Sequence, residues 1–200
     1  MLKKMIIDPL IRCKHSELLE VPTIVRVKKF DEDGSKDFIE QMEKALNSGQ
    51  TFIPIVVDSF GGQVYTLMEM INKMETCGLP CYTICESKAM SCGAMLFSMG
   101  HKRYMSPNAT LMLHDASLFT YGKAEEVKAD ARELERLNQL VFKMIAKNCQ
   151  QKENYFLDLI HEKGHADWYL NTKDAKKHNL CTNVGIPNLN IKVSVDFYLE

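Results

Sequence analysis

Long hydrophobic runs are missing from this sequence of 200 residues. No apolar segment approaches the ~20 residues that a membrane-spanning helix needs. The N-terminus opens with an apolar stretch, but Asp8 and Pro9 interrupt it and no small-residue cleavage site follows. We therefore expect no signal peptide, no membrane span and a cytoplasmic protein.

The sequence also lacks a surplus of charge of either sign. Lysine and arginine number 25, aspartate and glutamate number 26, and the formal net charge is −1. This balance argues against a nucleic-acid partner, which would select a basic surface. The seven cysteines are an odd number. In a chain without a secretion signal they indicate reduced thiols.

Three of these cysteines recur every four residues, at Cys77, Cys81 and Cys85. Such a series raises the possibility of a metal site. No histidine lies close enough in the sequence to complete a tetrahedral set. We interpret them as core thiols and predict no metal.

The order of apolar patterns predicts an α/β fold. Strands are predicted at 23–27, 52–57 and 81–85, separated by helices that start near Ser35 and at 64. Such alternation is typical of mostly parallel strands joined by right-handed connections. With 46% hydrophobic residues, the chain is long enough for one packed domain spanning 1–200.

The second half of the chain is predicted to be mainly helical. Helices are expected at 124–148 and 152–162, and a short one is expected to start near 171. The first is unusually long, so we expect part of it to project and pack on a partner subunit. Residues 1–20 are expected to form an arm, and 187–200 a strand-like tail.

The stretch 86–114 carries the strongest indication of function. It predicts a strand that turns sharply at Ser91, a short apolar helix at 94–99, and two strands of which the second ends at His114. A serine at a helix start and a histidine at a strand end, on one side of a sheet, is what a serine-nucleophile hydrolase needs. A serine that only caps the helix is the alternative.

Neighbouring residues supply candidates for the other catalytic parts. Gly61 and Gly62 follow a buried strand, where they let a backbone approach a ligand closely. The N–H groups of Gly62 and Cys92 are candidate oxyanion donors. Asp115 and Asp167 are both candidates for the acid that orients His114, and spacing does not choose between them.

Several motifs in order resemble ClpP, the peptidase subunit of the ATP-dependent caseinolytic protease (peptidase family S14). Residues 59–64 resemble S-P-G-G-x-V, and 89–94 resemble A-A-S-M-G-A. Residues 102–114 resemble K-R-x-x-x-P-N-x-x-x-M-x-H, and 167–175 keep the spacing of the family's acid segment. We interpret the chain as a divergent member of this family, and a phage origin is one interpretation of its divergence.

The resemblance implies a ClpP/crotonase-like fold of repeated ββα units with a long projecting helix. It implies Ser91 as nucleophile, His114 as base and Asp167 as orienting acid. Gly62 and Cys92 would be the oxyanion donors. It further implies unfolded polypeptides as substrates, a homo-oligomer of stacked seven-membered rings, an AAA+ unfoldase partner and no cofactor.

Some departures from the family pattern leave alternatives open. Phe60 replaces the proline of the glycine motif, and Asp115 follows the base where the family has glutamine. Lys88 lies three residues before Ser91 and could form a Ser–Lys dyad, although a solvated lysine is the simpler interpretation. The alternatives to a peptidase are a catalytically silent ring subunit and a crotonase-type acyl-CoA enzyme.

Overall fold

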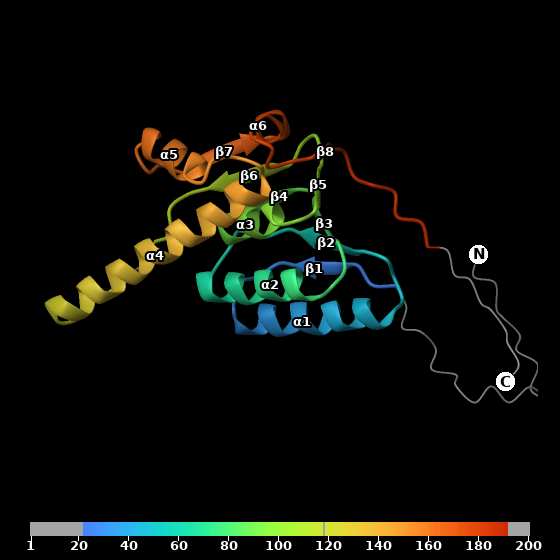
Figure 1. The fold of residues 1–200 in the computed structure, drawn as a ribbon, viewed down its shortest axis with the longest axis horizontal. Coiled ribbons are helices and arrows are strands. Elements are labelled where there is room, and N and C mark those ends of the chain that lie inside the picture. The colour runs from blue at the N-terminus through green and yellow to red at the C-terminus, as the bar shows by residue number, and fades with distance from the viewer. Residues whose placement is uncertain (1–21, 118, 192–200) are drawn as a thin grey trace, which may run out of the picture.

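The structure is a computed structural model that describes residues 22–117 and 119–191 (Figure 1). The predicted N-terminal arm and most of the predicted C-terminal strand lie outside these residues. Within them, helices alternate with strands of a mainly parallel sheet, which confirms the predicted α/β class. No helix in the described ranges has both the length and the hydropathy needed to cross a membrane.

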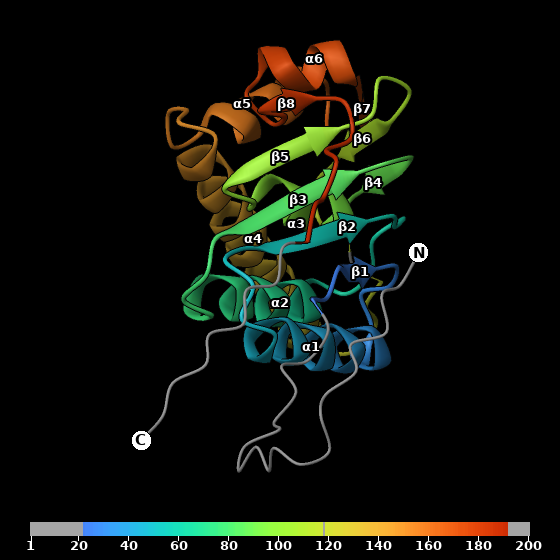
Figure 2. The ribbon, with the colours of Figure 1, turned by 90° about the vertical axis from the view of Figure 1, so that its right-hand side faces the viewer.

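Within the described part of the chain, five parallel strands form the larger sheet, in the order β1-β2-β3-β5-β8 (Figure 2). Their bounds are Val25–Val27, Ile53–Val57, Cys81–Cys85, Lys102–Met105 and Asn183–Val184. Every residue of β2 is buried, as its continuous apolar run predicts for a central strand. Residues that follow these strands therefore collect at one edge of the sheet.

A second, three-stranded sheet carries the chain toward the candidate site. It has the order β4-β6-β7, with bounds Lys88–Met90, Thr110–Leu113 and Trp168–Asn171. The first pair is parallel and the second antiparallel. Strands β7 and β8 were not predicted, because four and two residues are too few to show a clear period.

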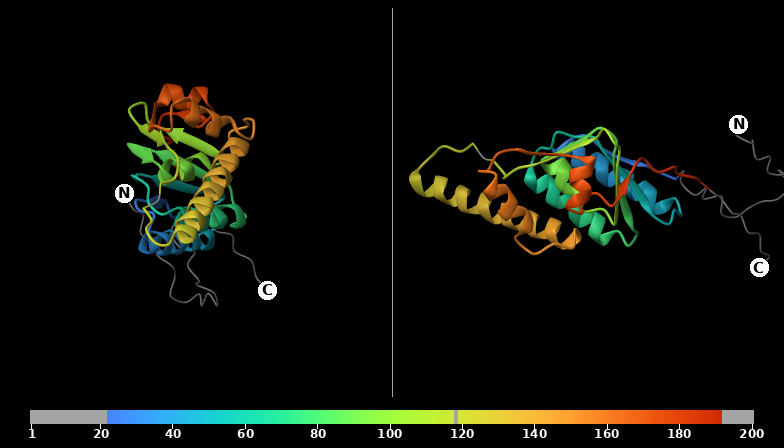
Figure 3. Two further views of the ribbon diagram at one scale, coloured as in Figure 1. Left: turned by 90° about the vertical axis from the view of Figure 1, so that its left-hand side faces the viewer. Right: turned by 90° about the horizontal axis from the view of Figure 1, so that it is seen from above.

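The described residues form six helices. Their bounds are Glu32–Asn47 (α1), Val64–Thr76 (α2), Cys92–Ser98 (α3), Ala124–Asn148 (α4), Tyr155–Glu162 (α5) and Thr172–Lys177 (α6). All of α3 is buried, so the helix behind the candidate nucleophile is part of the core. Helix α4 has the predicted bounds, and its N-terminal part extends beyond the rest of the fold (Figures 1 and 3).

The predicted start of α1 was wrong. Ser35 was expected to cap the helix, but Asp31 is the N-cap and its carboxylate accepts a hydrogen bond from the Gly34 N–H at 2.8 Å. Asp31 caps as well as a serine, and the acidic first turn suits the positive end of the helix dipole. The helix therefore begins at Glu32, three residues before the predicted start.

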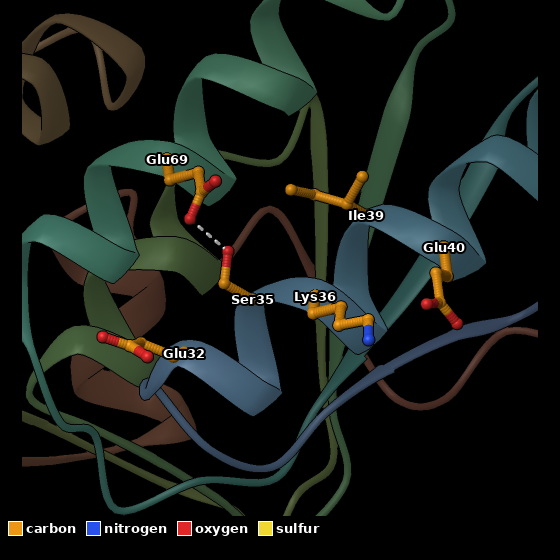
Figure 4. Close-up of a pocket in the computed structure, with 6 residues that line it drawn as sticks. All are labelled: Glu32, Ser35, Lys36, Ile39, Glu40 and Glu69. Atoms are coloured by element: carbon orange, nitrogen blue, oxygen red, sulfur yellow. Dashed lines mark hydrogen bonds between the residues drawn. The ribbon is translucent and has the colours of Figure 1, made fainter.

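Ser35 instead joins α1 to α2. Its hydroxyl is buried and donates to the Glu69 carboxylate (Figure 4). A surface hollow of about 410 Å³ lies there, lined by Glu32, Ser35, Lys36, Ile39, Glu40 and Glu69. None of the predicted site residues lines it.

Candidate active site

Ser91 occupies the sharp junction between β4 and α3. Its backbone has φ 53° and ψ −125°, a conformation that non-glycine residues rarely adopt. The backbone is fixed on both sides, because its N–H donates to the Met112 carbonyl at 2.8 Å and its carbonyl accepts from the Met95 N–H at 3.0 Å. The side chain makes no capping hydrogen bond. The capping alternative therefore does not account for this serine.

His114 faces Ser91 because of the pairing of β4 with β6. These parallel strands align Met90 with Met112, so the residues that follow both strands emerge at the same end. The Nε2 atom of His114 lies 2.7 Å from the Ser91 Oγ, within hydrogen-bonding distance. The two residues singled out from the sequence are thus in contact, and about a quarter of the histidine side chain is exposed.

Asp167 approaches the other ring nitrogen of His114. It directly precedes β7, whose Trp168 pairs with Leu113 of β6. The antiparallel register therefore places Asp167 opposite His114. The Asp167 Oδ1 atom lies 3.9 Å from the His114 Nδ1 atom. This distance suits an ionic contact and is too long for a hydrogen bond.

Asp115 turns away from His114 toward other partners. One carboxylate oxygen accepts from the Asn138 side-chain amide at 2.7 Å, and the other bonds the Nδ1 atom of His165. Partial burial alone would raise the pKa of Asp115, but hydrogen bonds from His165 and Asn138 and the charge of the histidines lower it. Of the two candidate acids, only Asp167 lies near the His114 ring by the contacts that the structure gives.

The diglycine loop lies directly against the serine. A Cβ atom added to Gly61 would lie 2.7 Å from the Ser91 Cβ and 2.9 Å from the Met90 carbonyl oxygen. With a φ of +103°, Gly61 is a position where a side chain would also be strained. The absence of a side chain at this position therefore allows the loop to approach the serine.

The thiol of Cys92 fixes the next residue of that loop. It donates to the Gly62 carbonyl at 3.2 Å, and burial raises its pKa, which keeps the thiol protonated as a donor. The Gly62 and Cys92 backbones thus lie on adjoining segments beside Ser91. This is the neighbourhood that two oxyanion donors would require.

Lys88 is not a solvated lysine, contrary to the sequence-based interpretation. Its ammonium group bonds the Asp58 carboxylate at 2.7 Å and lies 4.6 Å from the ring centre of Phe60. The aspartate and the aromatic face hold the ammonium group, and these contacts do not favour a Ser–Lys dyad. Phe60 itself is 72% exposed, at the position where the family pattern has proline.

The cysteine series lies in and around the core. Cys81 and Cys85 are buried, and burial raises the pKa of Cys85 to about 12. The sulfur atoms of Cys77 and Cys81 lie 3.7 Å apart. Across residues 22–117 and 119–191, no cysteine belongs to a group able to hold a metal ion.

One cluster was missed from the sequence. Asp115, His161 and His165 lie close together, although His114 is the one histidine that was singled out from the sequence. The spacing of four residues between the histidines gave no helical signal, because α5 ends at Glu162 and His165 lies in the turn beyond it. Their proximity to Asp115 could not be predicted, because it depends on how α5 packs beside the β6–α4 connection.

A family model described as Clp protease matches residues 12–187. The match includes Ser91, His114 and Asp167, together with the diglycine loop.

Proposed function

The chain belongs to the Clp protease family, and we propose that it hydrolyses peptide bonds through an acyl-enzyme formed at Ser91. Family membership supports a peptidase. The observation that carries the serine mechanism is the 2.7 Å contact between Ser91 Oγ and His114 Nε2. A nucleophile and a base within hydrogen-bonding distance are the central requirement for this chemistry.

In the proposed reaction His114 acts first as base and then as acid. As Ser91 Oγ attacks the carbonyl carbon of the scissile bond, its proton passes to Nε2. The C–N bond breaks when His114 returns that proton to the leaving amine, and an ester remains on Ser91. Water deprotonated by His114 then hydrolyses the ester.

Asp167 is the proposed orienting acid. Its carboxylate, 3.9 Å from Nδ1, stabilises the positive charge that His114 gains during attack. The backbone N–H groups of Gly62 and Cys92 are the proposed donors to the oxyanion. Each such donor typically lowers the barrier by about 3–4 kcal/mol.

The proposed substrates are unfolded polypeptides. By resemblance to the family, we propose a cytoplasmic homo-oligomer of two stacked seven-membered rings that encloses the active sites in a chamber. An AAA+ unfoldase would deliver extended chains to it, as in protein quality control. The hydrolytic chemistry described above uses only side chains, backbone N–H groups and water, so we propose no cofactor for it.

A fluorophosphonate probe and a short fluorogenic peptide test this proposal on the purified assembly. We expect the probe to label the wild type, and Ser91→Ala to lose labelling and about 10⁶-fold in kcat. Ser87→Ala is the matched control, because Ser87 is an exposed serine four residues away. We expect Ser87→Ala to retain both probe labelling and the wild-type kcat.

Each rival gives a different result. A catalytically silent subunit would neither take up the probe nor cleave the peptide. A crotonase-type enzyme would bind CoA, and its Ser91→Ala variant would still turn over a thioester. Equal labelling of wild type and Ser91→Ala would overturn the serine mechanism.

A further inference from the structure

Two segments distant in the sequence bring three metal-binding side chains together. Asp115 lies just after β6, whereas His161 is in the last turn of α5 and His165 is in the turn that follows the helix. One potential ligand atom from each side chain lies within 4.8 Å of the other two. Two imidazoles and a carboxylate form a common ligand set for zinc and similar divalent metals.

The end of α5 turns the two imidazoles toward each other. Gly164 and His165 both have positive φ, and the His165 N–H reaches back to the Ile160 carbonyl at 3.0 Å. This closes the helix in the manner of a Schellman cap. As a result, the ring centres of His161 and His165 lie 4.5 Å apart.

Asp115 is held in place from the opposite side. The side-chain NH2 group of Asn138 donates to the Asp115 Oδ1 atom at 2.7 Å. The side-chain oxygen of Asn138 accepts from the Ala116 N–H at 3.1 Å. The amide is therefore fixed at both ends, and Oδ2 is directed to His165. Outer residues that orient a ligand in this way are typical of metal sites.

The geometry points to a site for a divalent transition metal ion, such as Zn²⁺, held by Asp115, His161 and His165. We propose that solvent completes the coordination. Bond lengths near 2.0–2.2 Å require the ligand atoms to draw closer together. The histidines can do this, since both are exposed and the His165 side chain is 58% accessible.

The proposed site joins the β6–α4 connection to the turn between α5 and β7. Asp115 directly follows His114 in the sequence, and His165 lies two residues before Asp167. The proposal does not depend on peptidase activity. It can therefore be tested in the full-length Ser91→Ala protein, where failure of the serine mechanism has no effect on the result.

Titration of that protein with Co²⁺ followed by Zn²⁺ competition tests the site. We expect one Co²⁺ per chain with visible d–d absorption, lost on addition of Zn²⁺. The further change of His161 and His165 to Gln should abolish this absorption. Asn138→Ala should weaken binding by about 10–100-fold, because only the orientation of Asp115 is impaired.

Two controls identify the ligands. His101→Gln removes an exposed imidazole elsewhere and should leave the affinity unchanged. His114→Gln should also keep the cobalt spectrum if the metal is bound away from the catalytic histidine. Circular dichroism establishes that each variant is folded. No saturable Co²⁺ binding, or equal binding by the double histidine variant, would show that the cluster is only an ion pair.

Discussion

At the scale of single residues, the surroundings of Ser91 explain its unusual backbone. A non-glycine residue in such a conformation typically costs about 1–3 kcal/mol, which the rest of the fold must offset. Hydrogen bonds to Met112 and Met95 hold it on both sides. This conformation positions the side chain, which makes no capping hydrogen bond and is directed to His114.

The choice between two aspartates gives the prediction at this scale. We expect Asp167→Asn to lower kcat by up to about 10⁴-fold with little change in KM, because the imidazolium loses its carboxylate and the tautomer is no longer fixed. Asp115→Asn should lower kcat far less, since Asp115 bonds Asn138 and His165 instead of His114. Steady-state peptide hydrolysis measures both. A larger loss for Asp115→Asn would assign the orienting role to Asp115.

At the scale of elements, Arg103 ties β5 to segments that lie far away in the sequence. It is buried and donates to three backbone carbonyls, those of Gly100, Asn179 and Leu180, at 2.8–3.0 Å. Burial lowers the pKa of the guanidinium. The side chain thus connects the end of α3 to the segment between α6 and β8.

We expect Arg103→Met to lower the free energy of unfolding by about 3 kcal/mol. Methionine fills much of the space but leaves buried carbonyl oxygens without donors. Arg26→Met is the control, because Arg26 is exposed, and its cost should stay within about 0.5 kcal/mol. Chemical denaturation followed by circular dichroism measures the two. Equal effects would mean that water replaces the guanidinium at this site.

The elements also show how far the sequence determines the structure. Long periodic segments were predictable, as α4 shows with bounds that agree at both ends. Ser91 and His114 could be singled out because each follows a strand. Their contact depends on the β4–β6 pairing, and the approach of Asp167 on the β6–β7 pairing. Strand partners are chosen by tertiary packing, so periodicity alone could not supply them. The catalytic roles themselves remain predictions.

At the scale of the whole molecule, α4 divides into two halves with different surroundings. Its C-terminal half is built into the core through Val141, Phe142 and Ile145. The N-terminal half projects (Figures 1 and 3), and its apolar residues Val127 and Leu134 are only partly covered. An apolar stripe that continues past its own core is typical of a helix that packs on another subunit.

We therefore expect Leu134→Glu to break the assembly, because a carboxylate would be buried at the interface without a partner. Native mass spectrometry should show the wild-type oligomer replaced by smaller species. Gln139→Glu adds the same charge at an exposed position of the same helix and should keep the wild-type mass. If both variants retain that mass, the stripe does not form the subunit contact. If both lose it, the added charge on α4 is responsible, and the buried leucine contact is not.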